Sequence, residues 1–238
     1  MSETPAVDKC QPHLIEAGCK YFNTDKIGLE KRIIECTDKM RDKWNRKVSV
    51  REFYEDNEEY IPDLIFFNNN KRVQDVIYPI MSNMVLKNAD ILDFGAGIGE
   101  IGMNFAEGNN VYYWDINKKC KDFAKFLSEK TKRPIIQLEK EEDIYVRQYD
   151  MIITTDIFEH LTNPIEQLKL LIKCLKPGGF FLTTGIHAKI TPDIPYHLLI
   201  NIENYDEFDN YIDTIGIIRY YHSTCNEAVY VIQKWRNK

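Results

Sequence analysis

The segment Ile91–Glu100 constrains the fold of this 238-residue chain more than any other part of the sequence. It begins with a short apolar run that has the length and flanks of a buried parallel strand. Gly95, Gly97 and Gly99 follow directly, and a helical pattern starts at about Glu100. A glycine-rich turn between a strand and a helix lets a ligand approach the backbone, because any Cβ there would clash. The segment therefore predicts a ligand site at the carboxyl edge of a doubly wound sheet.

The chain after Ala89 alternates between strand and helix patterns. Further strands are predicted at Val111–Asp115, Ile135–Leu138, Met151–Thr155, Phe180–Thr184, Ile215–Tyr221 and Glu227–Gln233. The segment Lys176–Gly179 is predicted to stop a helix before the strand at Phe180, and a last helix is predicted over Tyr205–Thr214. Strands that alternate with helices indicate an α/β fold with a parallel sheet, and the short link between the last two strands predicts an antiparallel hairpin at one edge.

Helical patterns dominate the N-terminal third of the chain, from about residue 25 to residue 84. One apolar stripe recurs at spacings of three and four over Ile33–Trp44, and a second does so over Val73–Met84. No strand pattern interrupts them. We expect residues 1–84 to form an N-terminal arm and a helical cap, and residues 85–238 to form the ligand-binding domain.

Composition limits the classes of function. Hydrophobic residues make up 44% of the chain, enough for a substantial core, and 37 acidic residues against 31 basic ones argue against a nucleic-acid scaffold. No apolar run approaches the roughly 20 residues of a membrane span, and the N-terminus shows no apolar leader pattern. The six cysteines are scattered without a CxxC pair, which predicts reduced thiols, with Cys10 and Cys19 in a loose arm. We therefore expect a cytoplasmic protein without a membrane partner.

The acidic residues around the glycine turn indicate what kind of ligand binds there. Asp115 lies 20 residues after Gly95, at the end of the second predicted strand, where an acid can accept both hydroxyls of a ribose. A dinucleotide pattern requires glycine at position 100, but the chain has Glu100. Asp93 would repel a pyrophosphate and attract a cation. These features favour S-adenosylmethionine, a nucleoside without phosphates that carries an ammonium and a sulfonium.

Four blocks then define a family resemblance: ILDFGAGIGEIG, VYYWDI, YDMIITTDIFEHLTNP and LKPGGFFLTTG. In this order and spacing they make residues 88–185 resemble a class I S-adenosylmethionine-dependent methyltransferase. The resemblance implies a Rossmann-like, seven-stranded sheet that is mostly parallel with an antiparallel last strand. The N-terminal 80 residues lie outside it and resemble, more loosely, the helical lids of small-molecule methyltransferases.

Carried over position by position, the resemblance implies the cofactor site. The methionine end would be surrounded by Asp93, Gly95, Ala96, Gly97 and Gly99. Asp115 would bind the ribose and Ile116 would pack on the adenine. The acid that binds the adenine amino group would be Glu141 or Glu142, and Asp156 would lie beside the methyl group.

Histidines are the candidate bases. Methyl transfer from a sulfonium is an in-line displacement in which positioning and desolvation matter most, with a base where the nucleophile carries a proton. His160, His187 and His197 are all predicted at the carboxyl edge of the sheet, whereas His13 and His222 are expected to be incidental. For His160, a packing role, a base and a metal ligand all remain open.

Our main prediction includes no metal. In the alternative, Asp156, Glu159 and His160 bind one divalent ion, and His187 or His197 completes the site. The resemblance gives this alternative its basis, because quinone and RNA-end O-methyltransferases of the family use an acid-x-x-Glu-His arrangement in this way.

The segment from Phe53 to Arg72 is predicted to close over the site. Its aromatic and amide side chains suit a small polar ligand, and Arg72 can pair with a carboxylate. The predicted substrate contacts are Tyr54, Tyr60, Asn68, Arg72 and Phe158. A helical layer packed on the sheet is the compatible alternative.

These observations together predict an O- or N-methyltransferase that transfers the methyl group of S-adenosylmethionine to a small polar metabolite. One alternative is a protein or RNA methyltransferase. The other is a cofactor-binding regulatory protein without turnover. The acidic net charge and the helical cap favour a small-molecule acceptor over a nucleic acid.

Overall fold

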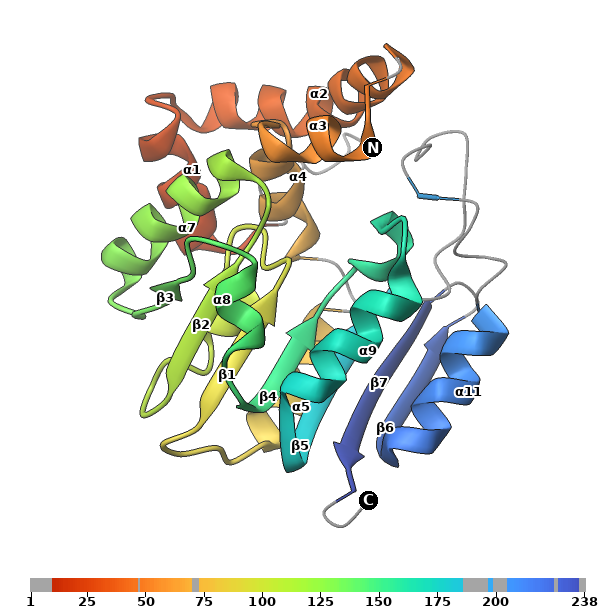
Figure 1. The fold of residues 1–238 in the computed structure, drawn as a ribbon. Helices are drawn as coiled ribbons and strands as arrows, with labels where there is room; N and C mark the ends of the chain where they lie inside the picture. The colour runs from red at the N-terminus through yellow and green to blue at the C-terminus, as the bar shows by residue number, and fades with distance from the viewer. Residues whose placement is uncertain are drawn as a thin grey trace.

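A seven-stranded sheet forms the centre of the molecule, with the strand order β3-β2-β1-β4-β5-β7-β6 (Figure 1). The computed structural model describes residues 10–46, 48–69, 73–185, 197–198, 205–224 and 227–235. The strands are β1 (Asp90–Phe94), β2 (Asn110–Trp114), β3 (Ile136–Gln137), β4 (Tyr149–Thr154), β5 (Leu175–Thr184), β6 (Gly216–Thr224) and β7 (Glu227–Lys234). Neighbouring strands from β3 to β5 are parallel, and β7 is antiparallel to both β5 and β6. This confirms the predicted Rossmann-like sheet and its terminal hairpin.

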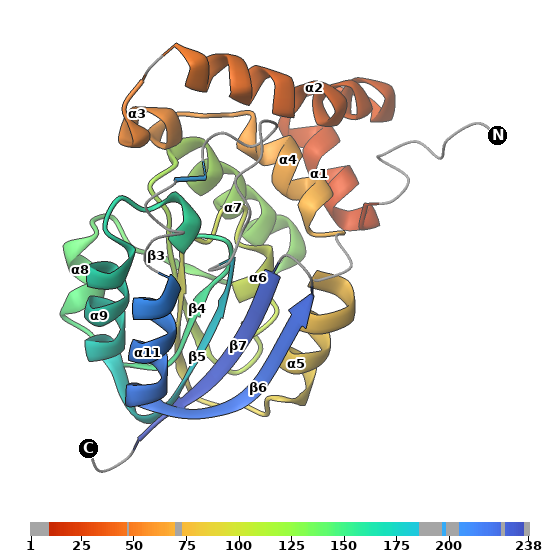
Figure 2. The same cartoon turned by 90° about the vertical axis from the view of Figure 1, so that its right-hand side faces the viewer.

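Helices cover both faces of the sheet (Figure 2). One face carries α8 (Glu142–Tyr145), α9 (Pro164–Cys174) and α11 (Tyr205–Ile215), and its core joins Leu168 and Phe208 to Phe181 of β5. The other face carries the π-helical turn η2 (Val73–Ile77) and α5 (Tyr78–Asn83). Val73, Ile77 and Met81 pack there against strand residues such as Ile91 and Leu182. Burial on both faces explains why the inner strands read as continuous apolar runs.

The N-terminal helices lie over the carboxyl ends of the parallel strands, at the top of Figure 1. They are α1 (Pro12–Tyr21), α2 (Lys26–Asn45), α3 (Val50–Glu55) and α4 (Tyr60–Phe67), and we call α1–α4 the cap. The cap shares one hydrophobic cluster with α7 (Lys118–Thr131), to which Leu29, Ile65 and Phe123 contribute. The predicted helical cap therefore has a place in the fold, while the domain division at residues 84 and 85 stays a prediction.

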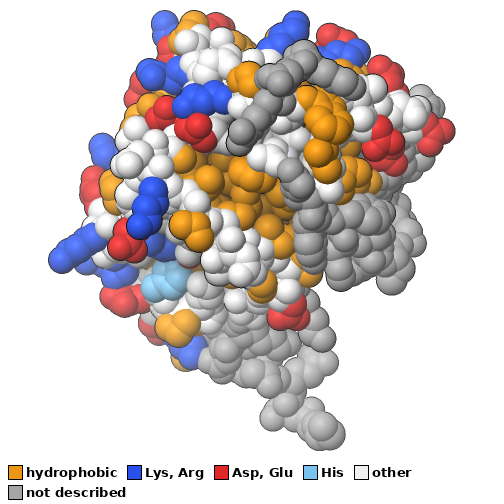
Figure 3. All heavy atoms as spheres, turned by 90° about the horizontal axis from the view of Figure 1, so that it is seen from below, with side chains coloured by type: hydrophobic (Ala, Val, Ile, Leu, Met, Phe, Trp, Pro, Cys, Tyr) orange, Lys and Arg blue, Asp and Glu red, His pale blue; other side chains and the backbone are white. Residues whose placement is uncertain are grey.

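The opposite end of the molecule, where the parallel strands begin, is seen from below in Figure 3. Hydrophobic side chains gather across the middle of this face, and Lys or Arg side chains alternate with Asp or Glu along part of its rim. None of the helices in the described ranges has both the length and the apolar character needed to cross a bilayer.

Two local predictions were wrong. Residues 10–21 are not a loose arm. Leu14 and Ala17 of α1 have no exposed surface and Cys10 is only 6% exposed, because this helix packs on α7, α2 and α4. The fifth strand was predicted to begin at Phe180, but it begins at Leu175, immediately after α9. Its register with β4 shifts there, so that the Lys176–Gly179 segment bulges out of the ladder around a proline that has no N–H to donate.

Candidate active site

The glycine turn after β1 has the backbone that the sequence predicts. Gly95, Gly97 and Gly99 have φ values of 67°, 53° and 75°, in the left-handed region that side chains disfavour. The backbone N–H groups of Gly95 and Ala96 donate to the Trp114 carbonyl of β2, at 2.9 and 3.1 Å. These bonds hold the turn against the carboxyl end of the neighbouring strand.

Two side chains that sequence reasoning missed close over this turn. An ideal Cβ on Gly95 would lie 2.1 Å from Cδ1 of Ile157, and one on Gly97 would lie 2.5 Å from Cδ1 of Leu64. Ile157 follows β4 and Leu64 belongs to α4 of the cap. The protein itself therefore packs on the turn, and Leu64 connects it to the cap.

Asp115 accepts two hydrogen bonds at the floor of the site. Its Oδ2 accepts from the Gly97 N–H and its Oδ1 from the Asn117 N–H, both at 2.7 Å. Each carboxylate oxygen keeps a further lone pair, so these bonds leave Asp115 able to accept from a bound ligand. Burial raises the pKa of Asp115 above its usual value, although the two N–H donors act in the opposite direction.

Asp93 has a different position from the one expected. It is 1% exposed and does not line the cavity described below; its Oδ2 accepts from the Gly102 N–H at 2.9 Å. A Cβ on Gly102 would approach that oxygen to 2.5 Å, which explains the glycine inside the short helix α6 (Glu100–Met103). Burial raises the pKa of Asp93 to about 7, opposed by the bond from Gly102 and reinforced by Asp115.

Glu100, the residue that breaks the dinucleotide pattern, is the centre of a buried ion pair. Arg133 donates to both of its carboxylate oxygens, at 3.0 and 2.7 Å, and His13 Nε2 lies 3.1 Å from Oε1. Glu100 is 2% exposed; burial by itself raises the pKa of its carboxyl, but His13 and Arg133 outweigh it and leave the pKa below its usual value. His13 thus has a structural contact, which ties α1 to the start of α6.

One cavity of about 740 Å³ connects the glycine turn, the cap and the loop after β4. The predicted cofactor residues that line it are Gly95, Ala96, Gly97, Asp115, Ile116, Glu141 and Asp156. Asp93, Gly99 and Glu142 are not among the residues that line it. The Glu141 carboxylate accepts from the Tyr145 hydroxyl at 2.8 Å, whereas the Glu142 side chain is exposed. Between the two acids considered for the adenine end, the geometry therefore favours Glu141.

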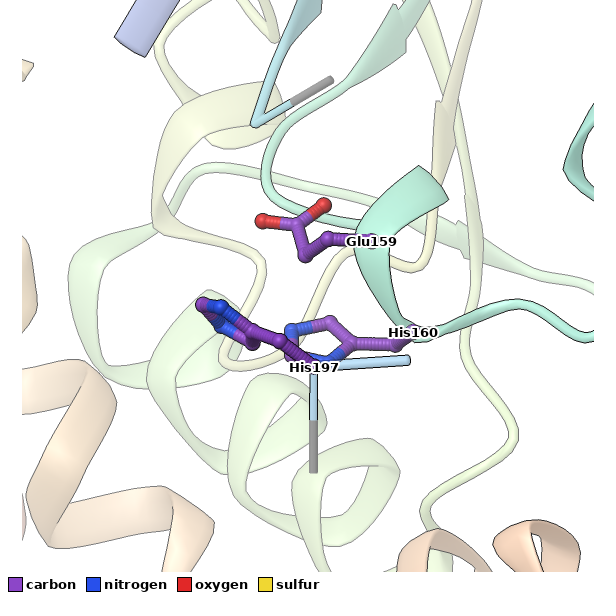
Figure 4. Close-up of side chains that lie close together, drawn as sticks. All are labelled: Glu159, His160 and His197. Carbon is purple, nitrogen blue, oxygen red and sulfur yellow. The ribbon is translucent and has the colours of Figure 1, made fainter. Parts of the chain in front are cut away.

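His160 and His197 line the same cavity and lie next to each other (Figure 4). Their ring centroids are 4.8 Å apart, and the backbone N–H of Leu198 donates to the Glu159 carbonyl at 2.9 Å, which fixes this contact. The Tyr54 hydroxyl of α3 lies 2.7 Å from His160 Nδ1. A side chain of the cap thus contacts the leading candidate base directly.

Glu159, His160 and His197 also form a group that could hold a metal ion. One donor atom from each lies within 4.8 Å of the other two, and Glu159 is 2% exposed (Figure 4). Asp156, part of the predicted alternative, is not in this group; its Oδ1 accepts from the Thr184 hydroxyl at 3.0 Å. One carboxylate and two imidazoles are a chemically reasonable donor set for a divalent ion.

The predicted substrate residues are divided between cavity and core. Tyr54, Tyr60 and Asn68 line the cavity. Phe158 is 1% exposed and packs on Phe181 and Phe208 in the core, and it is not among the residues that line the cavity. Arg72 and His187 lie outside the described residues, as does the side chain of His222.

A family comparison decides the class of protein. A family model described as a methyltransferase domain matches residues 45–221. The chain belongs to this family. The match confirms the predicted class I S-adenosylmethionine-dependent methyltransferase, and it begins at residue 45, so that it includes α3 and α4 of the cap as well as the sheet.

The curated relatives of the methyltransferase match it at low identity and over part of its length. The ubiquinone biosynthesis O-methyltransferase of Vibrio cholerae serotype O1 is 30% identical over 126 residues, which are 48% of this chain and 51% of the relative. The chain thus spans about half the length of the curated relatives it matches.

Solved structures support the fold. Magnesium protoporphyrin IX methyltransferase from Synechocystis PCC 6803, solved with S-adenosylhomocysteine, has a TM-score of 0.54 at 16% identity, covering 73% of this chain and 86% of that one. An N-methyltransferase from Bradyrhizobium japonicum, also solved with S-adenosylhomocysteine, has a TM-score of 0.51 at 13% identity, covering 71% and 90%. At these identities the likeness concerns the fold.

Proposed function

We propose that this methyltransferase transfers the methyl group of S-adenosylmethionine to an oxygen or nitrogen of a small polar metabolite. The observation that carries the proposal is that the glycine turn, Asp115, His160 and His197 all line one cavity. One cavity would therefore hold the methyl donor and the acceptor together, which is the main requirement of an in-line displacement. The small-molecule acceptor is also supported by the name of the ubiquinone biosynthesis relative.

The proposed cofactor contacts follow from the residues that surround the glycine turn and line the cavity. Asp115 would accept the ribose hydroxyls with the lone pairs that Gly97 and Asn117 leave available. Ile116 and Glu141 would contact the adenine, since both line the cavity next to Asp115. Asp93 would act through Gly102 by holding α6 in place rather than by touching the ligand.

His160 is the proposed general base, and Tyr54 decides which nitrogen can serve. If Nδ1–H of His160 donates to the Tyr54 oxygen, Nε2 carries the lone pair that can accept a proton from the acceptor. If the Tyr54 hydroxyl donates instead, Nε2 carries the proton and cannot act as a base. The proposal requires the first tautomer, with His197 beside the ring to limit its rotation.

A divalent ion is compatible with the same residues. Glu159, His160 and His197 would hold it, and when bound it would polarise an acceptor oxygen and lower the pKa of its hydroxyl. In that case His160 would orient the acceptor as a ligand of the ion, and the Tyr54 contact would fix the ring for it. Whether transfer survives treatment with a chelator distinguishes this arrangement from the metal-free one.

The function is tested by incubating the protein with methyl-labelled S-adenosylmethionine and a fractionated metabolite extract. The proposal predicts label in a small-molecule fraction, and strongly reduced labelling by a His160→Ala/His197→Ala variant. Asp38→Ala, an exposed change on α2, serves as the control and should label normally. Label that appears only in protein or RNA would contradict the small-molecule acceptor, and no label in any fraction would favour a regulatory protein without turnover.

A further inference from the structure

Helix α4 turns one polar residue of a largely apolar face toward the cavity. The residues of α4 and its C-cap that line the cavity recur at spacings of three and four: Tyr60, Asp63, Leu64, Phe67 and Asn68. The opposite face holds Ile61 and Ile65, neither of which has exposed surface. This is the pattern of an amphipathic helix whose second face looks into a cavity. Asp63 therefore faces the ligand space from within the cap.

The Asp63 carboxylate has only a weak partner. Within the described part of the chain, its one hydrogen bond comes from the Cys36 thiol, at 3.9 Å from Oδ1, and no Lys or Arg forms an ion pair with it. A thiol is a weak donor, and burial followed by the charge of Asp63 raises the pKa of Cys36 to about 12, so this partner stays neutral. Burial raises the pKa of Asp63 to about 6, against the small opposing effect of the thiol. At neutral pH the Asp63 carboxylate is mainly ionised, and no Lys or Arg in the described part of the chain pairs with its charge.

Four other acids on the cavity wall have better donors, and a further one, Glu159, belongs to the candidate metal group with His160 and His197. The donors of the four are Arg133 for Glu100, backbone N–H groups for Asp115, Thr184 for Asp156 and Tyr145 for Glu141. Among the described residues that line the cavity, the one Lys or Arg is Arg51, whose side chain is 70% exposed and lies 3.7 Å from Glu55. The cavity thus presents a surplus of negative charge. Outside the group of Glu159, His160 and His197, Asp63 is the acid of the cavity wall best placed to gain from a cation.

Aromatic rings complete the environment of Asp63. Tyr60 and Phe67 lie three residues before and four residues after it on the same helix face. A cation beside a carboxylate and over aromatic faces gains both a charge-assisted hydrogen bond and cation–π attraction. We propose that Asp63, with Tyr60 and Phe67, binds a protonated amine of the methyl acceptor. This inference rests on the proposed function, and it narrows the acceptor to an amine-bearing molecule.

The proposal also says which atom is not methylated. An ammonium has no lone pair, so the group held at Asp63 is an anchor and not the nucleophile. The Tyr60 and Tyr54 ring centroids are 5.3 Å apart, and Tyr54 contacts His160. Tyr54 therefore lies between the anchor, which includes Tyr60, and the candidate base. The acceptor therefore carries its amine at one end and a hydroxyl or a second nitrogen at the other.

The test measures binding of two probes that differ only in whether they carry a protonated amino group. Tyramine and 4-ethylphenol are titrated calorimetrically into the wild-type protein, once alone and once with saturating S-adenosylhomocysteine. We expect tyramine to bind at least about tenfold more tightly, because a buried hydrogen bond to a charged group has that magnitude. Asp63→Asn should abolish the preference, whereas Asp38→Asn, which changes the net charge equally on the exposed side of α2, should keep it.

A second variant guards against misfolding of the first. Phe67→Leu keeps the carboxylate and should weaken tyramine more than 4-ethylphenol. Equal affinities of the two probes for the wild type, no binding of tyramine, or an unchanged preference in Asp63→Asn would each overturn the proposal. The proposal would also be overturned if Asp63→Asn lost tenfold affinity for S-adenosylhomocysteine but kept the preference for tyramine. Asp63 would then bind the ammonium of the cofactor and not an amine of the acceptor. Failure of the wild type to bind S-adenosylhomocysteine would contradict the proposed function alone, because the probes are also titrated without it.

Discussion

Replacing Arg133 by Met removes the partner of a buried charge and should destabilise the protein strongly. The Glu100 carboxylate is 2% exposed and receives two hydrogen bonds from the guanidinium, which is itself 24% exposed. Breaking a buried pair of this kind by removing one partner typically costs about 3–5 kcal/mol, because the remaining charge stays desolvated. His13 still contacts Oε1 in the variant, so we expect a loss near the lower end, about 3 kcal/mol at pH 7.

The loss should depend on pH with a definite sign. In the wild type the pKa of Glu100 lies below its usual 4.5, so its contribution to stability is present above that pH and is lost as the pH falls through the folded pKa. Without Arg133 the effect of burial, which raises the pKa, is opposed by His13 alone. Protonation of Glu100 then removes the unpaired buried charge of the folded variant. The difference in the free energy of unfolding between variant and wild type should therefore shrink between pH 7 and pH 5.

Urea unfolding followed by circular dichroism measures both effects. Arg41→Met is the matched control, because Arg41 pairs with an Asp38 side chain that is 72% exposed and such pairs contribute about 0–1 kcal/mol. Adding Glu100→Gln to Arg133→Met should recover part of the lost stability. The reasoning is refuted if Arg133→Met destabilises no more than Arg41→Met, or if its effect is the same at both pH values.

Three further predictions concern the site. Gly97→Val should lower the affinity for S-adenosylhomocysteine at least about tenfold in a calorimetric titration. A side chain at φ 53° costs about 1–2 kcal/mol and must also displace Leu64. Unchanged affinity would show that the turn is not the site. Treatment with a chelator followed by dialysis should leave the wild-type rate unchanged if His160 acts as a base, and should abolish it, with recovery on adding a divalent ion, if Glu159, His160 and His197 hold a metal. Amide hydrogen exchange in residues 50–69 should slow when S-adenosylhomocysteine and acceptor are added together, as closure of the cap over the reaction requires; equal protection with and without ligands would identify a fixed layer.

The parts of the site that are local in sequence were predictable. The strand, the glycine turn and the acid at the end of the next strand lie within 25 residues, Ile91–Asp115, and each has a physical signature of its own. Once the parallel sheet was predicted, the carboxyl edge placed His160 near them. In the structure the three glycines have left-handed φ values, Asp115 is buried, and His160 lines the same cavity.

The parts that depend on distant contacts were not predictable. Glu100 read only as a departure from a glycine pattern, because its partners His13 and Arg133 are 87 and 33 residues away. The sequence gives no sign that Leu64 packs on the glycine turn or that Asp63 faces the cavity. Both depend on how α4 packs over the sheet. Phe158 follows a strand at the expected edge, but the 3₁₀ turn Phe158–His160 points it into the core.

The central claim is that Asp115 and the glycine turn bind the nucleoside of S-adenosylmethionine, and a calorimetric titration with S-adenosylhomocysteine tests it most directly. The wild type should bind with a dissociation constant in the micromolar range, from about 1 to 100 μM. Asp115→Ala should weaken binding by at least about tenfold, because a buried acid that accepts from a ligand contributes more than about 1.4 kcal/mol, and Asp38→Ala should bind as the wild type does. Binding of NADH by the wild type without any response to S-adenosylhomocysteine would contradict the claim.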